Sequence, residues 1–397
     1  MADTDKPIVV LCLPRLGDML AHELMLCGYV PGFSDDKSAV VKGNFADVFR
    51  LNLMLRTASR VLWPVASFPA SNPNELYRGA SEIPWENNMR SDGYFSIDSF
   101  VRNAAIRDTR FANVKFKDAV ADRFVKTHGR RPNSGPEKTG IVIYFRWIDN
   151  HCDVYFDSSG ETLARHGYRV RSVRAPLIES LAAALVYQSG WKGEGHFLNP
   201  MCGSGTLAIE AALIRSGMYP ALKRRNFAFH QLKEFNPKQW NGLCDHLESK
   251  KAKSSANWGR IIASDRDPAA VEAARINARA AGVEELIEFS VCDFAVSPVP
   301  EGAGVVLMNP EYGERMGDAT SLEPVYASIG DFFKQRCSGY RGYVFTGNMD
   351  LAKKIGLHAR SRIPFFNARI DCRLIEYELY QGSRRSAQGQ SPSGISP

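Results

Sequence analysis

The feature that most constrains the fold is an alternation of apolar runs and amphipathic segments after about residue 174. The apolar runs, which predict strands, lie at 197–200, 261–264, 287–292, 305–308 and 342–346. Segments with helical spacing precede or separate them, at 175–188, 206–216, 268–281 and 322–333. Chains that alternate in this way fold into a parallel sheet with helices on both faces. We therefore expect a parallel, doubly wound α/β domain here, with its last strands at 365–367 and 373–380.

The first 165 residues are less regular. Apolar runs at 8–13 and 38–41 alternate with helical segments at 16–27 and 44–55, which suggests a small α+β layer. Further on we expect strands at 93–101, 141–147 and 152–158, and a helix at 115–127. The stretch 219–258 is polar and basic without a clear period. A chain of 397 residues is long enough for two or three domains, and its low-complexity end, 383–397, is expected to be disordered.

The eight cysteines are scattered and form no C-x-x-C pair or zinc-ligand grouping. In a chain of this length they indicate reduced thiols in a cytosolic protein, and no metal is predicted. The apolar run at 8–13 is too short for a signal-peptide core or a membrane span. We therefore expect a soluble, cytoplasmic protein that does not enter a membrane.

Positive charge is unevenly distributed along the chain. The formal net charge is +7, and the window 102–131 holds nine Lys and Arg against three Asp and Glu. Smaller basic clusters lie at 223–225 and 250–253. Any one cluster is most simply a solvated helix face. Together they are compatible with a polyanionic partner, which is predicted on other grounds below.

A glycine-rich turn follows the first strand of the predicted α/β domain. The segment NPMCGSGT runs from Asn199 to Thr206, where a helix is expected to begin. Gly203 and Gly205 let backbone N–H groups approach a ligand, and the helix N-terminus favours negative charge. The turn lacks the Lys-Ser/Thr of a phosphate loop, so ATP is not the indicated ligand. By itself such a turn is weak support for a binding site.

Acidic residues follow the next two strands. Asp265 is suited to accept hydrogen bonds from ribose hydroxyls, whereas Asp267, before Pro268, is better explained as a helix N-cap. After the third strand, Asp293 can accept from an adenine amino group and Phe294 can stack on the ring. Taken alone, Asp265 could be a simple loop carboxylate, and the third segment is better explained as an ordinary strand-to-loop turn.

The fourth strand is followed by the segment NPEY, which can bind an amino group. The amide oxygen of Asn309 and the carbonyl of Pro310 can accept both hydrogens of one –NH₂, which leaves the nitrogen lone pair free to attack a methyl group. Tyr312 can stack on the base that bears the amine. No strong base is needed, because positioning and electrostatics suffice. Alone, the segment is compatible with an Asx turn. With the other three strand ends, it predicts a site for an adenosine-containing methyl donor, and it disfavours a nicotinamide dehydrogenase.

These segments resemble the class I RNA methyltransferases that carry a THUMP domain. The chain is most similar to the bacterial 23S rRNA guanine-N2 methyltransferases of the RlmL type, often described as N6-adenine-specific DNA methylases. The resemblance covers most of the chain and is carried by FKDAVADR at 116–123, RRP at 130–132, DSSG at 157–160, HGYR at 166–169, RAPL at 174–177, CGSGTLAIEAA at 202–212, SD at 264–265 and YGER at 312–315.

The resemblance implies an architecture, a donor and a partner. It implies a ferredoxin-like subdomain over 1–65, a THUMP RNA-binding domain over 66–165 and a Rossmann-like methyltransferase domain over 166–382. The donor is then S-adenosylmethionine, the partner is structured RNA such as 23S rRNA, and the window 102–131 is available for phosphate contacts. The family's functional positions fall on Asn199, Cys202, Gly203, Gly205, Asp265, Asp293, Asn309, Pro310 and Tyr312.

Two positions depart from the family's pattern. Asn199 stands where the family usually has Asp, which removes a favourable charge if this position contacts the donor's ammonium group. Glu311 stands where a second Pro is usual, and its carboxylate could accept from the N1–H and N2–H of guanine. Guanine-N2 methylation of 23S rRNA is the favoured interpretation. The alternatives are the same reaction on tRNA, adenine-N6 methylation of DNA, and an RNA-binding protein that has lost turnover.

Overall fold

The computed structural model describes residues 5–173, 176–251, 258–313 and 318–380. The predicted disordered end at 383–397, and parts of the RAPL and YGER segments, lie outside these ranges. The chain forms two compact units. The first comprises Met1–Arg169, Leu177–Ala184 and Ser216–Lys253, and the second comprises Val170–Pro176, Leu185–Arg215 and Ser254–Pro397. Two segments of the first unit, Leu177–Ala184 and Ser216–Lys253, therefore lie within residues 166–382, the range expected for the methyltransferase domain.

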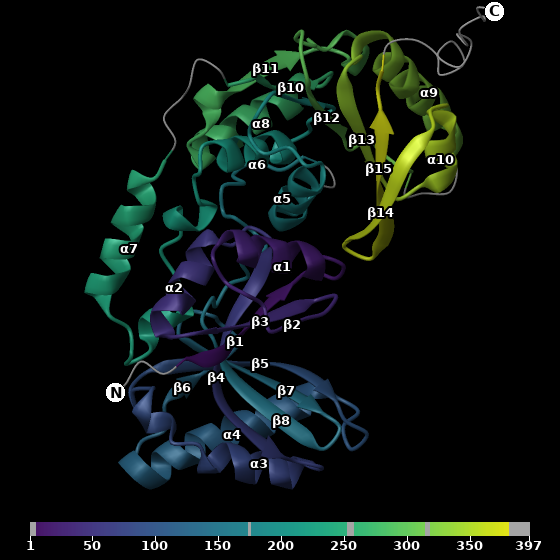
Figure 1. Cartoon of the computed structure of the whole chain (residues 1–397). Coiled ribbons are helices and arrows are strands. Elements are labelled where there is room, and N and C mark those ends of the chain that lie inside the picture. The colour runs from purple at the N-terminus through teal and green to yellow at the C-terminus, as the bar shows by residue number, and fades with distance from the viewer. Residues whose placement is uncertain (1–4, 174–175, 252–257, 314–317, 381–397) are drawn as a thin grey trace, which may run out of the picture. The chain divides into compact units, whose positions relative to one another are not determined.

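The first unit is built on one eight-stranded sheet in the order β2-β3-β1-β4-β8-β7-β5-β6 (Figure 1). Its strands are β1 Lys6–Cys12, β2 Phe33–Ser34, β3 Ser38–Gly43, β4 Ala58–Pro69, β5 Tyr94–Arg102, β6 Asn133–Ser134, β7 Ile141–Ile148 and β8 His151–Asp157. The order shows that strands from both expected N-terminal domains belong to one continuous sheet, with β4 at the centre.

Strand β4 joins the two halves of this sheet and was not predicted from the sequence. Its first part pairs with β1 (Val9↔Leu62), and its second part pairs with β8 (Phe68↔Cys152). Pro64 lies next to a shift in the β8 register, where the loss of one backbone donor can be tolerated. Proline within an apolar run is what made the strand hard to predict. The expected boundary at residue 65 falls inside β4.

The helices of the first unit are α1 Gly17–Leu26, α2 Phe45–Met54, α3 Pro73–Glu82, α4 Thr109–His128 and α7 Pro237–Ser249. α3 and α4 lie side by side, and α4 packs on β5 (Figure 1). α7 belongs to the stretch in which no helix was expected. Its apolar residues Trp240, Leu243, Cys244 and Leu247 follow the i, i+3, i+4, i+7 spacing of an amphipathic helix, a pattern that the sequence analysis missed, and Leu247 is buried. The segment around it is anchored on α2 by aromatic rings, with Phe229 4.8 Å and Trp240 6.0 Å from Phe49.

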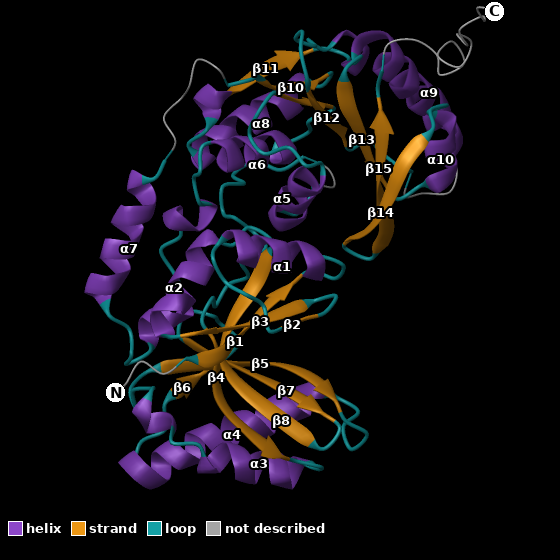
Figure 2. Cartoon of the chain, in the orientation of Figure 1, coloured by secondary structure: helices purple, strands orange, loops and turns teal. Residues whose placement is uncertain are grey.

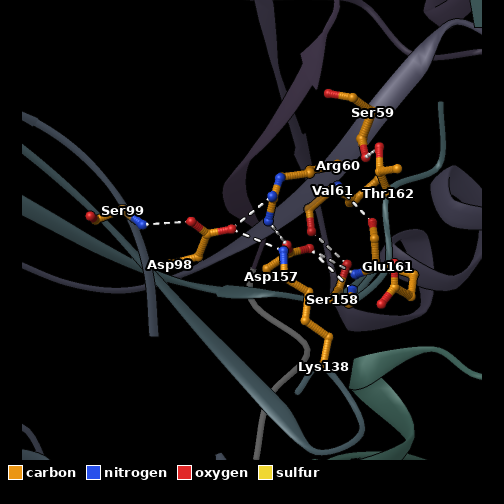
Figure 3. Close-up of polar contacts among 12 residues, drawn as sticks. Ser59, Arg60, Val61, Asp98, Ser99, Lys138, Asp157, Ser158, Glu161 and Thr162 are labelled. Atoms are coloured by element: carbon orange, nitrogen blue, oxygen red, sulfur yellow. Dashed lines mark hydrogen bonds and ion pairs between the residues drawn. The ribbon is translucent and has the colours of Figure 1, made fainter. Parts of the chain in front are cut away.

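The DSSG segment at 157–160 has a structural role in the first unit. Arg60 on β4 bridges the buried carboxylate of Asp157 and the carboxylate of Asp98, and Lys138 also binds Asp98 at 3.0 Å (Figure 3). Ser158 donates from its hydroxyl to the Val61 carbonyl at 2.6 Å. Burial raises the pKa of Asp157, and the Arg60 guanidinium opposes this rise. The segment thus fixes the end of β8 to β4.

The second unit contains a seven-stranded sheet in the order β11-β10-β9-β12-β13-β15-β14 (Figure 2). Its strands are β9 His196–Pro200, β10 Ile261–Asp265, β11 Ile287–Val291, β12 Gly304–Met308, β13 Tyr340–Thr346, β14 Ala359–Asn367 and β15 Ile370–Glu378. The helices are α6 Thr206–Arg215, α8 Pro268–Ala281, α9 Asp318–Arg336 and α10 Met349–Lys354, and the division between units passes through α5 Glu179–Gln188.

The prediction of an all-parallel sheet is wrong at one strand. β15 pairs antiparallel with both β13 and β14. A tight turn at Ala368, whose φ is +54°, connects β14 directly to β15, so no crossover helix is present to keep the strands parallel. The other strands follow the expected α/β alternation. None of the helices in the described ranges combines the length and apolarity needed to cross a lipid bilayer.

Candidate functional site

The four segments singled out in the sequence lie at one edge of the second sheet. β9 lies between β10 and β12, and β11 lies beyond β10, all parallel. Their carboxyl ends therefore meet at the same edge, where ligands bind in open α/β sheets. Backbone bonds fix two of the loops on β10: Cys202 N–H donates to Ser264 O at 2.9 Å, and Cys292 N–H donates to Asp265 O at 3.0 Å.

The glycine-rich turn requires its glycines for conformation and for space. Gly203 and Gly205 have φ of +52° and +82°. A Cβ on Gly205 would lie 2.8 Å from the Cβ of Ala274 on α8, closer than carbon atoms can approach. The turn leads into α6, which begins at the buried Thr206. The N–H groups of Cys202, Gly203 and Gly205 donate to Ser264 O, the Asp265 carboxylate and Cys202 O, so the result is a short, fixed turn at a helix N-terminus.

Asp265 lies against this turn. One carboxylate oxygen accepts from the Gly203 N–H at 3.0 Å, and the other accepts from the Asp267 N–H at 3.1 Å. A carboxylate has about four acceptor positions, so it retains capacity for ribose hydroxyls. The prediction for Asp267 is confirmed: its side chain accepts from Ala269 N–H at 2.9 Å and caps α8, with Pro268 at the first position.

Two buried amide oxygens on adjacent strand ends have no hydrogen-bond partner among the described residues. They are Oδ1 of Asn199 on β9 and Oδ1 of Asn309, just after β12. Asn199 is 1% exposed, and its amide nitrogen donates to the Leu307 carbonyl at 3.0 Å, which links β9 to β12. A buried acceptor without a partner costs about 1–3 kcal/mol. Both lie at the carboxyl ends of neighbouring strands, the edge at which ligands bind in sheets of this kind.

Asp293 and Phe294 have structural partners as well. Asp293 accepts from Ala295 N–H at 2.9 Å and caps the short 3₁₀ helix Phe294–Val296. Phe294 is 8% exposed, and its ring meets Phe332 edge-on at 6.0 Å in the core that α9 builds. The ordinary strand-to-loop turn that the sequence favoured here is therefore present, and Asp293 caps it. The predicted contacts of both residues with an adenine remain predictions.

The NPEY loop is held by side chains from distant parts of the second unit. Tyr326 on α9 donates to the Glu311 carbonyl at 3.2 Å. Asn367, at the end of β14, donates to the Tyr312 hydroxyl oxygen at 2.6 Å, and Asn348 donates to the Tyr312 carbonyl at 3.4 Å. The Tyr312 ring is half-buried and its phenol oxygen is anchored. Sequence reasoning did not identify these three partners, because they belong to segments with no recognisable motif.

The Cys202 thiol, which the family resemblance places in the donor motif, is a neutral group. It is 8% exposed, and burial, together with the nearby Asp265 carboxylate, raises its pKa above the usual range. A neutral buried thiol contributes packing rather than nucleophilicity. Among the described residues no group of three or more His, Cys, Asp or Glu is arranged to hold a metal ion.

Fold and site together define a Rossmann-like methyltransferase domain that follows two smaller N-terminal domains. Family models agree: an RlmL ferredoxin-like domain matches residues 7–62, a THUMP domain matches 70–157, and an RMKL-like methyltransferase domain matches 166–376. The last match covers more than half of the chain. The chain belongs to the RMKL-like methyltransferase domain family.

Known proteins resemble the chain over nearly its whole length. It is 36% identical, over 94% of its length, to the ribosomal RNA large subunit methyltransferase K/L of Syntrophotalea carbinolica, and 34% identical, over 92%, to that of Allochromatium vinosum. It covers 54% and 50% of those proteins, so it spans about half their length. Protein slr0064 of Synechocystis sp., named as a candidate RNA methyltransferase, is 34% identical over 95% of the chain and 98% of its own length.

Solved structures support the same fold. A methylase candidate from Clostridium difficile 630 superposes with a TM-score of 0.85 at 27% identity, covering 96% of this chain and all of that one. SMU.472, a candidate methyltransferase solved in complex with SAH, superposes with a TM-score of 0.84 at 25% identity, covering 96% of this chain and 99% of its own.

Proposed function

We propose that the chain methylates an exocyclic amino group of RNA with S-adenosylmethionine as donor, and that the target is the N2 amine of a guanine in 23S rRNA. The observation that carries the proposal is the pair of buried, unpartnered amide oxygens of Asn199 and Asn309 on neighbouring strand ends. One is suited to the donor and the other to the acceptor. Family membership, the THUMP match and the names of the K/L relatives support RNA as the substrate.

The donor would be held by three of the four strand ends. The backbone of the turn containing Cys202, Gly203 and Gly205, with Thr206 at the start of α6 and the Asn199 amide oxygen, would bind its amino-acid part. Asp265 would accept from the ribose, and Asp293 and Phe294 would contact the adenine. When bound, S-adenosylmethionine supplies an electrophilic methyl group.

The acceptor base would be held by the NPEY loop. Asn309 Oδ1 and the Pro310 carbonyl would accept the two amine hydrogens, and Tyr312 would stack on the base with its hydroxyl fixed by Asn367. The nitrogen forms its bond to the methyl carbon as the sulfur–methyl bond breaks, and it then releases one proton to water. The oxygens of Asn309 and Pro310 stabilise the positive charge that develops on the nitrogen, so the loop contributes positioning and electrostatics.

The acidic residue in this loop is proposed to favour guanine. The Glu311 side chain is exposed, while its carbonyl is fixed by the Tyr326 hydroxyl. A fixed backbone with an exposed carboxylate suits an acceptor for the N1–H of guanine, because the corresponding ring nitrogen of adenine carries no hydrogen. Replacing Glu311 with Pro should reduce the preference for guanine. Full activity with unchanged base preference in that variant would refute this role.

The basic window of the first unit would contact RNA phosphates. On and beside α4, Arg110 pairs with Asp108 and Arg131 pairs with Asp118, so part of the positive charge is neutralised locally. Exposed Lys126 and half-exposed Lys115 and Lys117 remain to contribute to a backbone-directed, salt-sensitive interaction. A ribosomal RNA substrate would mean that the protein acts in the cytoplasm.

The test is a methylation assay with three nucleic acids. The chain is incubated with isotopically labelled S-adenosylmethionine and, separately, with in vitro-transcribed 23S rRNA, unmodified tRNA and DNA, and the products are digested to nucleosides. We expect label in N2-methylguanosine from 23S rRNA, with the Asn309→Ala variant as control. Label only in N2-methylguanosine from tRNA would refute the rRNA target, and label only in N6-methyladenine from DNA would refute the RNA substrate. Absence of donor binding by calorimetry would indicate an RNA-binding protein without turnover.

A further inference from the structure

The buried side chain of Asn277 on α8 forms hydrogen bonds with the backbone of two separate segments. Asn277 is 1% exposed. Its oxygen accepts from Val170 N–H at 2.8 Å and from Arg171 N–H at 2.9 Å. Its nitrogen donates to Arg171 O at 2.8 Å and to Ser204 O at 3.1 Å. An amide has two acceptor positions and two N–H donors, so all of its hydrogen-bonding capacity is used.

These bonds connect two segments that are 33 or more residues apart in the sequence. Ser204 is the central residue of the glycine-rich turn. Residues 170–173, which we call the strap, form an irregular segment of the second unit next to that turn. A Cβ placed on Gly203 would lie 3.4 Å from the Cγ2 atom of Val173, so the strap passes directly over the turn. Asn277 therefore holds the strap and the turn in one arrangement.

The turn is thus fixed from two sides. Asp265 accepts the Gly203 N–H, and Asn277 binds the Ser204 carbonyl together with the strap. A ligand that enters such a turn does not have to order it on binding, and preorganisation of this kind raises affinity without adding a contact to the ligand. Asn277 makes no contribution of this sort to the base-binding loop, which Asn348 and Asn367 fix instead.

We propose that Asn277 is a positioning residue for the methyl donor: it holds the strap and the glycine-rich turn in the donor-binding conformation and does not touch the donor itself. The proposal rests on the proposed function, because it takes the turn to be the donor site. Loss of the Asn277 side chain leaves two backbone N–H groups and two carbonyls of the strap and turn without their partner. Without the donor, the strap and the turn then adopt several conformations. Donor binding has to order them, and the entropy lost in doing so weakens the affinity.

The chain offers a matched control in Asn52 on α2. Asn52 is also buried, at 0% exposure. Its side chain donates to Val48 O and to Ser158 Oγ, both at 2.8 Å, and accepts from Ser159 Oγ at 2.7 Å. It lies in the first unit, so its loss disturbs the fold to a similar degree without affecting the donor turn. A purely structural role for Asn277 predicts that the two alanine variants behave alike in donor binding.

The experiment measures donor affinity by calorimetry, RNA affinity with in vitro-transcribed 23S rRNA, and the urea unfolding midpoint, for the full chain and its variants. We expect Asn277→Ala to raise the Kd for S-adenosylmethionine about tenfold or more, with RNA affinity unchanged. Asn52→Ala should leave the donor Kd unchanged. Hydrogen exchange should show that donor binding protects the strap amides more strongly in Asn277→Ala than in the wild type. A donor Kd within twofold of the wild type in Asn277→Ala would overturn the proposal.

A second variant decides the case if Asn277→Ala does not fold. Asn277→Asp keeps an oxygen that can accept from the strap N–H groups and removes the N–H donors to Arg171 O and Ser204 O. A donor Kd raised about threefold or more would support the proposal, and an unchanged Kd would overturn it. Failure of the wild type to bind S-adenosylmethionine would instead refute the proposed function, and this inference with it. Donor binding by the wild type with no effect of either variant would refute this inference alone.

Discussion

Replacing Asn309 with Ala is the most direct perturbation of the proposed chemistry. Its Oδ1 atom is buried and has no hydrogen-bond partner among the described residues. Removing an atom that stabilises no protein contact should therefore leave the fold intact. The free energy of unfolding of Asn309→Ala should stay within about 1 kcal/mol of the wild type, or rise slightly, because a buried acceptor without a partner is itself destabilising.

The effect on catalysis follows from the same burial. In the transition state the amine nitrogen acquires positive charge, so the hydrogen bond to Asn309 becomes stronger there than with the neutral amine. A hydrogen bond to a charged group contributes about 1.5–3 kcal/mol. At about 1.4 kcal/mol for each factor of ten, the expected loss in kcat is roughly 10- to 150-fold. Donor affinity should change little, because this oxygen is proposed to bind the acceptor amine and not the donor.

The assay is a single-turnover measurement of methyl transfer to saturating RNA, with donor Kd and urea unfolding measured alongside. Asn309→Asp serves as the control, since it keeps an acceptor oxygen at the same place and should retain far more activity than the Ala variant. The reasoning would be refuted by a fall in kcat of less than threefold in Asn309→Ala. A loss of stability above about 2 kcal/mol would also refute it, because the side chain would then have a structural role that its unpartnered oxygen does not suggest.

Three further predictions concern the packing around the site and the first unit. Arg215 is a buried cation whose pKa burial lowers to about 10; it donates to three backbone carbonyls and lies near the indole rings of Trp191 and Trp258. Arg215→Lys should therefore lower the urea-derived stability by about 2–4 kcal/mol, and a loss below 1 kcal/mol would contradict this. Gly205→Ala should abolish measurable donor binding in calorimetry, because its φ of +82° and the contact with Ala274 leave no room for a Cβ; wild-type affinity would refute this account of the turn. The hydrogen bond from Arg123 lowers the pKa of Glu86 in the folded protein. The pair therefore stabilises the fold at pH values above the unfolded-state pKa of Glu, and this stabilisation is lost as the pH falls through the lowered pKa. Glu86→Gln should flatten that part of the stability–pH curve measured by urea unfolding between pH 7 and pH 3, and an unchanged slope would count against the pair.

Much of the second unit followed from the sequence. Apolar runs separated by helical segments define parallel strands, and their carboxyl ends must share one edge. That rule alone brings together Asn199, Asp265 and Asn309, although 110 positions separate the first from the last. The N-cap role of Asp267 was equally readable, because Asp before Pro at a helix start satisfies a local requirement. Local periodicity and local capping need no knowledge of distant residues.

The parts that the sequence did not reveal depend on distant contacts. β4 contains Pro64 and was not expected to be a strand, yet it is the central strand of its sheet because β1 and β8 pair with its two halves. β15 runs antiparallel because a tight turn joins it directly to β14.

The sequence by itself thus determined which strand ends meet at one edge of the second sheet and which chemical groups they present. Only the tertiary structure decided how those groups are held. Asn277 reaches Ser204, and Asn367 reaches Tyr312, across long separations in the chain. An isolated Asn in a helix or at a strand end carries no pattern, since its partners are backbone and side-chain atoms that folding alone brings within hydrogen-bonding distance. The same holds for the buried state of the Asn199 and Asn309 oxygens, because burial is a property of the packed chain and not of the motif.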